Sequence, residues 1–163
     1  MIVHIDWTTI SEIWSDQLWP GRISPIEPTS AMCYLGGYDL ENMKYPTTFF
    51  GYMLDDKIVG VNSGHGCMNH GYRSRGLWVD PNYRNNGIGV SLLTATINQA
   101  KLENFNQVWS FPRKTSWSTY KGAGFELTSN WEQSETSDSN AYCSFLIAEV
   151  KYNKYLTSKA QPR

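Results

Sequence analysis

Several familiar signatures are missing from this chain. No Gly-Lys-Ser or Gly-Lys-Thr run occurs in it, and this absence excludes a P-loop. The dinucleotide-binding fingerprint requires a third glycine three residues after Gly89, and Leu92 stands at that position instead. Two well-known classes of nucleotide-binding protein are therefore excluded, and any phosphate site must be built in another way.

Cysteine is scarce as well. Cys33, Cys67 and Cys143 lie far apart and form no Cys-x-x-Cys pair, which argues against a zinc ribbon or a redox motif. An odd number of cysteines is typical of reduced thiols in a cytosol. We therefore expect no bound metal and a cytoplasmic location.

Charge of one sign and long apolar runs are also lacking. The 14 Lys and Arg residues nearly balance the 15 Asp and Glu residues, and no long basic run occurs, so we expect no nucleic-acid partner. No apolar run approaches the ~20 residues that span a bilayer. The first residues do not combine positive charge with an apolar core, so we expect no signal peptide and no membrane partner.

Aromatic residues, by contrast, are plentiful. The chain has 7 Trp and 10 Tyr, residue types that build cores and also line pockets and interfaces. A length of 163 residues is typical of a single domain. We expect that domain to cover residues 1–152 and to be followed by a polar tail over 153–163.

Hydrophobic periodicity and turn residues predict the order of secondary structure. Strands are expected over residues 1–5, 48–54, 57–68, 72–79, 107–111, 125–128 and 142–150. Helices are expected after a cap at Thr8 or Thr9, over 88–104 and over 116–122, with loops and one short helix over 21–46 and a long hairpin loop over 129–141. This order predicts an α+β (mixed α/β) fold, with a mostly antiparallel, twisted sheet of about six or seven strands and about four flanking helices.

One glycine-rich turn is the most informative segment. Arg84-Asn85-Asn86-Gly87-Ile88-Gly89 follows the strand-like run 76–81 and opens the helix expected over 88–104. The first amides of a helix have no partner within the helix and lie at the positive end of its dipole, so they bind phosphate. Glycines there let the backbone approach a ligand closely. The alternative is a strand-to-helix turn with a purely structural purpose.

A second motif lies further along the chain. Tyr120-Lys121-Gly122-Ala123-Gly124-Phe125 follows a second short strand and a second helical stretch. This Tyr and Gly-Phe pair, behind Arg-x-x-Gly-x-Gly, resembles the GNAT superfamily of acyl-CoA-dependent N-acyltransferases. The resemblance extends from Leu77 to Phe125. It implies a GNAT-like fold, with the strand ending at Val79 splayed from the strand at 107–111, and acetyl-CoA as co-substrate.

The resemblance also implies the residues that hold this co-substrate. The strand edge at 77–79 would pair with the pantetheine arm, and the turn at 84–90 would cradle the diphosphate. The implied set is Leu77, Trp78, Val79, Arg84, Asn85, Asn86, Gly87, Ile88, Gly89, Val90, Arg113 and Ser116. Arg113 departs from the family, which often has Asn there, so this contact is open. The alternatives are core packing for the strand residues and a surface role for Arg84.

The implied chemistry is an N-acetyl transfer to a primary amine by direct attack. Tyr120 matches the family's usual general acid, and its alternative is a tyrosine packed beneath the Gly-Phe turn. The general base is not evident, since Arg73 and Arg75 occupy the strand where many relatives have a carboxylate. His65 is a candidate base because histidine titrates in the right range. A non-catalytic acyl-CoA-binding module and an aromatic-rich domain without nucleotide are the competing interpretations.

The acceptor is the least defined part of this interpretation. Aromatic residues on irregular segments often line sites, so Trp19, Tyr34, Tyr38 and Trp131 are candidate substrate-binding residues. They would narrow the cleft and favour a small-molecule amine over a protein tail. Acidic residues at 132, 135 and 138 would either attract a cationic amine or form a solvated loop. A monomer and a homodimer are both compatible with the sequence.

Overall fold

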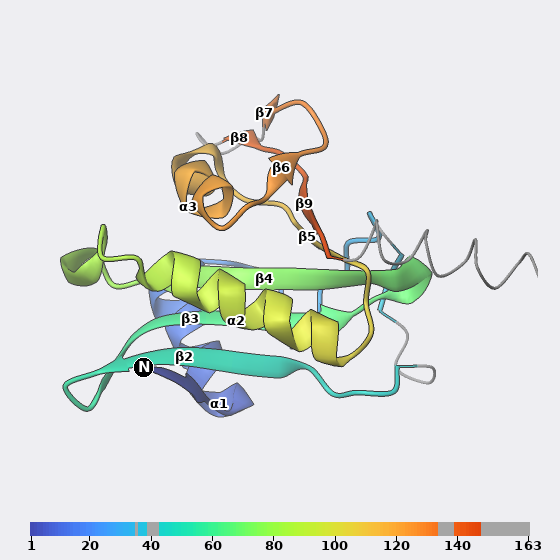
Figure 1. Cartoon of the computed structure of the whole chain (residues 1–163). Coiled ribbons are helices and arrows are strands. Elements are labelled where there is room, and N and C mark those ends of the chain that lie inside the picture. Colours follow the sequence, from blue (N-terminus) through green and yellow to red (C-terminus); the bar gives the residue numbers. More distant parts are fainter. Residues whose placement is uncertain (35, 39–42, 134–138, 148–163) are drawn as a thin grey trace, which may run out of the picture.

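The computed structural model describes residues 1–34, 36–38, 43–133 and 139–147. Its main feature is a seven-stranded sheet in the order β1-β2-β3-β4-β5-β9-β6 (Figure 1). The strands are β1 (Ile2–His4), β2 (Thr48–Leu54), β3 (Lys57–Gly66), β4 (Gly71–Val79), β5 (Gln107–Ser110), β6 (Glu126–Leu127) and β9 (Cys143–Leu146). Only β4 and β5 pair in parallel, so the predicted mixed, mostly antiparallel sheet is confirmed. The tail predicted at 153–163 lies outside the described residues.

Three α-helices accompany the sheet in the described part of the chain: α1 (Trp7–Ile13), α2 (Ile88–Leu102) and α3 (Trp117–Gly122). Helix α1 continues directly into η1 (Trp14–Leu18), a stretch of π-helix. The expected cap at Thr8 or Thr9 is wrong, because the Asp6 carboxylate caps α1 and accepts a hydrogen bond from the Thr9 amide at 2.8 Å. No helix forms in the described residues of 21–46.

The long loop expected over 129–141 contains structure of its own. Strands β7 (Glu132–Gln133) and β8 (Ser139–Asn140) form a separate two-stranded sheet. Trp131, just before β7, lies edge-on to Trp117 of α3, with ring centroids 6.3 Å apart. This contact ties the start of the small sheet to α3. The acidic residues predicted at 135 and 138 lie outside the described residues.

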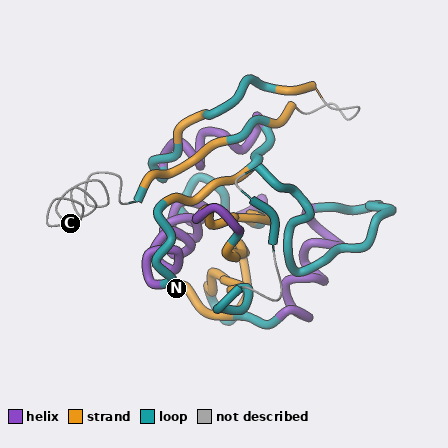
Figure 2. Tube along the Cα trace, turned by 90° about the vertical axis from the view of Figure 1, so that its right-hand side faces the viewer, coloured by secondary structure: helices purple, strands orange, loops and turns teal. Residues whose placement is uncertain are grey.

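Helices cover both faces of the main sheet (Figures 1 and 2). On one face, α2 places Leu92 against Val59 and Ile97 against Tyr72 in two buried clusters. On the other face, Ile10 of α1 and Trp14 of η1 belong to a third cluster. The fold is thus a sheet held between α2 and the N-terminal helical segment, as layered α+β domains require.

Strand β4 has two halves with different neighbours. Its first residues, Gly71–Arg73, pair with β5 over three positions that end at Arg73 opposite Trp109. Its last residues, Leu77–Val79, have no partner in β5, which ends at Ser110 and turns away (Figure 1). We call Gly71–Arg73 the closed half and Leu77–Val79 the open half. The splayed strand pair predicted from the resemblance is therefore present.

A bulge separates the two halves of β4. Gly76 has φ +79°, and the pairing register with β3 shifts opposite it. A Cβ atom at Gly76 would lie 2.3 Å from the ring of Trp14, so only glycine fits there. The Trp14 indole Nε1 donates a hydrogen bond to the Gly76 carbonyl at 2.9 Å. The N-terminal helical segment is thereby fixed to the point where β4 changes neighbours.

Candidate cofactor and active site

A cavity of about 630 Å³ lies beside the open half of β4. The turn that opens α2, the segment before α3, and the end of η1 form its other walls. Its lining residues are Gln17, Leu18, Leu77, Trp78, Val79, Tyr83, Arg84, Asn85, Gly87, Ile88, Gly89, Val90, Arg113, Thr115, Ser116, Ser118 and Thr119. Every residue that the sequence predicted for cofactor binding lines this cavity except Asn86. The Asn86 side chain instead folds back and donates to the Tyr83 carbonyl at 3.1 Å.

The turn before α2 presents its backbone to the cavity. Asn85 and Gly87 both adopt left-handed φ angles, of 65° and 75°, and Gly87 caps α2 without a side chain. Among the hydrogen bonds of the described residues, none is donated by the amides of Ile88, Gly89 or Val90. Alternating right- and left-handed residues at a helix start form a concave group of amides that suits an anion. The local geometry is that of an anion site.

Gly89, in the first turn of α2, packs closely against α3. A Cβ atom there would lie 2.6 Å from Cγ2 of Thr119, and 3.8 Å and 3.9 Å from the side chains of Val79 and Leu77. Gly87 differs, because a Cβ atom on it would meet nothing within 4 Å. The two glycines therefore have separate purposes: Gly87 supplies a left-handed turn, and Gly89 supplies space.

The described residues that line the cavity carry positive charge and no carboxylate. Arg84 is exposed and its Nε donates to the Val79 carbonyl at 2.9 Å, which anchors the side chain beside the open half. Arg113 is exposed and reaches the Leu18 carbonyl at 3.5 Å, so it connects the segment before α3 to η1. No Asp or Glu is found among these described lining residues. Its electrostatic character therefore favours an anionic ligand.

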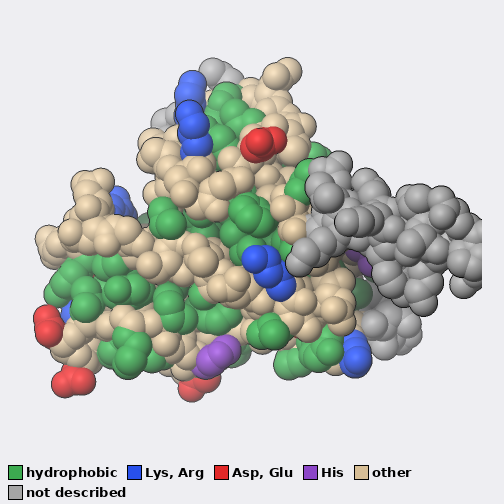
Figure 3. Space-filling view, in the orientation of Figure 1, with side chains coloured by type: hydrophobic (Ala, Val, Ile, Leu, Met, Phe, Trp, Pro, Cys, Tyr) green, Lys and Arg blue, Asp and Glu red, His purple; other side chains and the backbone are tan. Residues whose placement is uncertain are grey.

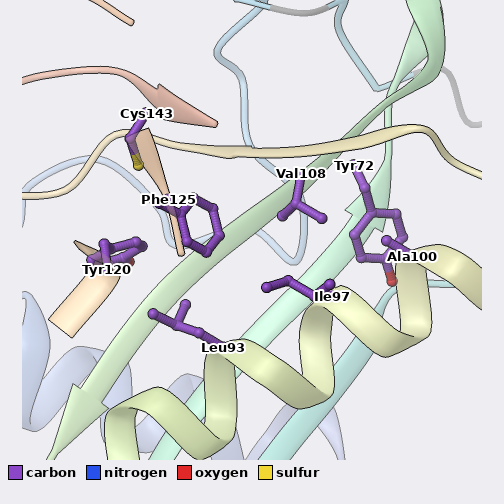
Figure 4. Close-up of a cluster of buried hydrophobic side chains, with 8 residues drawn as sticks. All are labelled: Tyr72, Leu93, Ile97, Ala100, Val108, Tyr120, Phe125 and Cys143. Atoms are coloured by element: carbon purple, nitrogen blue, oxygen red, sulfur yellow. The ribbon is translucent and has the colours of Figure 1, made fainter. Parts of the chain in front are cut away.

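Tyr120 lies in the core beside this cavity and does not line it. Its side chain is 4% exposed and packs with Leu93, Phe125 and Cys143 (Figure 4). The phenol oxygen is 3.5 Å from Oγ of Ser110. Burial raises the pKa of Tyr120 to about 12. The phenol is thus protonated at neutral pH, as a proton donor must be.

His65 is fully buried, and both of its ring nitrogens have partners. Nε2 accepts a hydrogen bond from the Ser30 amide at 3.0 Å, and Nδ1 lies 3.1 Å from the Gly66 carbonyl. Burial lowers the pKa of His65 to about 4. The neutral ring holds the Ser30 segment to the sheet, and this arrangement gives the predicted base role no support. That role stays a prediction.

The four aromatic residues predicted for the acceptor site do not form one cluster. Trp19 lies 5.1 Å from the Arg75 guanidinium, and Tyr34 stacks on Tyr142 with ring centroids 3.9 Å apart. Tyr38 packs edge-on to His65 at 5.3 Å. Trp131 lies edge-on to Trp117 of α3. An acceptor site lined by all four stays a prediction.

Two buried arginines on β4 are a feature that sequence reasoning did not anticipate. Arg73 lies over the Trp109 ring at 4.7 Å, and Arg75 lies between the rings of Trp14 and Trp19. Burial lowers the pKa of both guanidinium groups, that of Arg75 to about 10. Alternation along β4 places both side chains on the face away from α2. The only hint in the sequence is this two-residue spacing.

Comparison with known proteins identifies the class to which this fold and cavity belong. Residues 9–125 match the model of the "Acetyltransferase (GNAT) family". The chain therefore belongs to the GNAT acetyltransferase family and is an acyltransferase, so the resemblance seen in the sequence is confirmed. A search of curated protein sequences finds no match.

Solved structures show the same fold at low sequence identity. A candidate N-acetyltransferase from Lactobacillus plantarum has a TM-score of 0.65 and 14% identity, covering 90% of this chain and 97% of that one. The ribosomal-protein-S18-alanine N-acetyltransferase from Escherichia coli has a TM-score of 0.61 and 13% identity, covering 90% and 93%. A candidate streptothricin acetyltransferase from Bacillus anthracis, in complex with acetyl coenzyme A, has a TM-score of 0.56 and 17% identity, covering 66% of each chain.

Neither a cluster of metal ligands nor a membrane-spanning helix occurs in the described residues. No group of three or more His, Cys, Asp or Glu side chains there could hold a metal ion. None of the helices in the described ranges is long and apolar enough to cross a bilayer. On the face shown in Figure 3, charged side chains of both signs are scattered among apolar and neutral ones. The described side chains on this face form no large patch of one sign.

Proposed function

We propose that the protein transfers an acetyl group from acetyl-CoA to the primary amine of a small molecule. The observation that carries this proposal is the cavity beside the open half of β4. Its lining combines three features: amides at the start of α2 that donate no hydrogen bond, the side chains of Arg84 and Arg113, and the strand edge of the open half, which has no partner in β5. Coenzyme A presents the matching groups in the same order: a diphosphate and an extended amide-containing arm ending in a thiol.

The diphosphate end fits the turn before α2. The amides of Ile88, Gly89 and Val90 would donate to phosphate oxygens at the positive end of the α2 dipole. Arg84 would add a charge-assisted hydrogen bond from its terminal nitrogens, since its Nε is already held by Val79. Among the described residues of the lining there is no carboxylate to repel a phosphate.

The pantetheine arm fits the open half of β4. A strand edge without a partner recognises an extended chain by backbone hydrogen bonds, as an added strand would. Leu77 and Val79 also line the cavity together with Gly89, whose missing side chain lets Thr119 of α3 pack close to the start of α2. The cavity volume of about 630 Å³ lies within the usual range for sites that take ligands of this size.

Acetyl-CoA would supply the activated thioester. The protein would hold the thioester in place and donate a proton to the departing thiolate. The acceptor nitrogen must reach the carbonyl in its neutral form. The departing thiolate requires a proton, and the candidate donor is the Tyr120 phenol, which lies 3.5 Å from Oγ of Ser110 at the end of β5. A small molecule is the proposed acceptor because aromatic side chains cover this face of the sheet: Trp19 lies against Arg75 of β4, and Tyr34 lies against Trp109 of β5. A cytoplasmic location and the monomer or homodimer state stay predictions.

The test has two stages that use the intact protein. Titration with acetyl-CoA in a calorimeter is expected to show binding with one site per chain. Release of free thiol from acetyl-CoA is then followed across a panel of small amines, with ribosomal and peptide N-termini as the contrasting acceptors. Absence of acetyl-CoA binding would overturn the proposal. Binding with turnover only on peptide N-termini would overturn the small-molecule acceptor and leave the donor site intact.

A further inference from the structure

Ser110 is the meeting point of three groups at the place where β4 and β5 separate. Its Oγ accepts a hydrogen bond from NH1 of Arg73 at 3.0 Å and donates one to the Ser74 carbonyl at 2.8 Å. The Tyr120 phenol oxygen lies 3.5 Å from the same Oγ. The side chains of Arg73, Ser110 and Tyr120 are all less than 10% exposed. A buried chain of polar groups therefore leads from a guanidinium to the candidate general acid.

The hydrogen bonds at the Ser74 carbonyl allow the Ser110 hydroxyl to change its acceptor. This carbonyl accepts a hydrogen bond from Arg73 NH1 at 2.6 Å in addition to the one from Ser110. A serine hydroxyl has a single hydrogen, which can point to only one acceptor at a time. Because Arg73 also serves the Ser74 carbonyl, the Ser110 hydrogen can leave it without creating an unsatisfied buried acceptor.

Arg73 brings a positive charge into the core without a carboxylate to neutralise it. Within the described ranges the one salt bridge is that between Lys57 and Asp80, and the Nε of Arg73 has no hydrogen-bond partner. A buried charge without a partner is costly, so its presence calls for a compensating interaction. A phenolate at Tyr120, which is linked to Arg73 through the Ser110 hydroxyl, would provide that compensating interaction. The positive charge of Arg73 acts to lower the pKa of Tyr120, opposing the effect of burial.

We propose that Arg73 and Ser110 are positioning residues that stabilise the Tyr120 phenolate formed during acetyl transfer. This inference rests on the proposed function. The acceptor nitrogen forms a bond to the thioester carbonyl carbon, the carbon–sulfur bond breaks, and the thiolate sulfur takes the phenol proton of Tyr120. The Ser110 hydroxyl then turns from the Ser74 carbonyl to the phenolate oxygen. The nitrogen loses its extra proton to water, and water returns one to Tyr120.

A double-mutant cycle separates this role from a merely structural one. Ser110→Ala, Tyr120→Phe and the double variant are compared with the wild type in kcat and in KM for acetyl-CoA, at saturating amine. We expect Ser110→Ala to lower kcat about tenfold in the wild-type background and less than about twofold in the Tyr120→Phe background, with KM changed less than about twofold. A structural role would lower kcat equally in both backgrounds.

Ser63→Ala is the matched control. Ser63 is a fully buried serine on the neighbouring strand, and its hydroxyl donates to the Arg75 carbonyl at 2.7 Å. This substitution removes an equivalent buried hydrogen bond with no link to Tyr120, and kcat is expected to stay within about twofold of the wild type. An equal loss of kcat in Ser63→Ala and Ser110→Ala would overturn the inference.

The remaining outcomes are also decisive. Equal effects of Ser110→Ala in the two backgrounds, or no effect on kcat, would show that Ser110 does not act through Tyr120. Unchanged turnover in Tyr120→Phe would remove the general acid, and with it this inference, while leaving acetyl-CoA binding and acetyl transfer standing. Failure of the wild type to bind acetyl-CoA would instead contradict the proposed function itself. The two failures are therefore distinguished by binding measured separately from turnover.

Discussion

The closed and open halves of β4 show how one strand can serve two purposes. In the closed half, Tyr72 and Arg73 are buried on opposite faces of the sheet and the backbone pairs on both sides. In the open half, Leu77 and Val79 are only partly buried and one backbone edge borders the cavity. The bulge at Gly76 separates the two regimes. Stability is concentrated at one end of the strand, and the proposed ligand edge lies at the other.

This contrast leads to a general expectation. Substitutions around the open half should change the affinity for acetyl-CoA with little effect on stability. Substitutions around the closed half should change the free energy of unfolding with little effect on that affinity. Each prediction below tests one side of this division.

The largest effect is expected from Gly89→Leu. The new side chain would begin 2.6 Å from Cγ2 of Thr119, so Thr119 or the start of α2 would have to move, and both line the cavity proposed for acetyl-CoA. We expect the dissociation constant for acetyl-CoA, measured by calorimetry, to rise at least about 100-fold, or roughly 3 kcal/mol. Gly122→Ala is the control, because its Cβ atom would make an ordinary 3.5 Å contact with Val90. Retained affinity in Gly89→Leu would place the ligand elsewhere.

A pH effect is expected at the closed half, where His65 pairs with Arg73. The pKa of His65 is lowered to about 4, so the unfolded chain binds the proton more readily than the folded one. The free energy of unfolding should therefore be intact above pH about 6.5 and fall by up to about 3 kcal/mol as pH decreases toward 4. Urea unfolding across this range should show the loss in the wild type and in the control His4→Gln. In His65→Gln it should be largely absent; an unchanged pH dependence there would refute the assignment.

A smaller loss of stability is expected from Val108→Ala. Val108 is fully buried and pairs with Tyr72 across the closed half. Removing two methyl groups from this site should lower the free energy of unfolding by about 2 kcal/mol, and affinity for acetyl-CoA should stay within about twofold. Leu102→Ala, at an exposed position, serves as the control. A large loss of affinity in Val108→Ala would break the division between the two halves.

The smallest effect is expected from Gly87→Ala at the start of α2. The site is open, so the penalty comes only from the left-handed φ of 75°. Alanine there costs roughly 1 kcal/mol, which corresponds to about fivefold weaker acetyl-CoA binding if the turn shifts to relieve it. Asparagine tolerates this conformation better, so Gly87→Asn should bind more tightly than Gly87→Ala. Equal affinities for the two variants would show that the left-handed conformation is not required.

The parts of this molecule that local sequence determines were predicted well. Apolar alternation and helical spacing located β2, β3, β4 and α2 to within a few residues. The glycine-rich turn identified the cavity, because its amides and glycines are consecutive in the chain. The order of strands and helices predicted a mixed sheet, and the parallel pairing of β4 with β5 is what makes the sheet mixed.

The parts that depend on distant contacts were not predicted. Gln17 and Leu18 line the cavity only because η1 packs against β4, far along the sequence. Arg73 and Arg75 stand out in the sequence only as residues placed where many relatives have a carboxylate, and their burial depends on the tryptophans that pack against them. The acceptor aromatics were grouped by residue type, whereas their positions follow from the path of an irregular segment. Such placements are set by packing, which residue patterns do not encode.

The π-helical turn at η1 has a consequence for how this wall of the cavity can vary. The Trp19 amide bonds to the Trp14 carbonyl at 2.7 Å, five residues back, so the turn holds one residue more than an α-helix would. Deleting a single residue between Ser15 and Gln17 would leave an ordinary helical turn, in which the Trp19 amide still bonds to the Trp14 carbonyl, now four residues back. Trp14 would keep its bond to Gly76, and Leu18 would keep its place in the cavity lining. A length change of one amino acid is thus tolerated here with the ligand chamber and the scaffold behind it both unchanged.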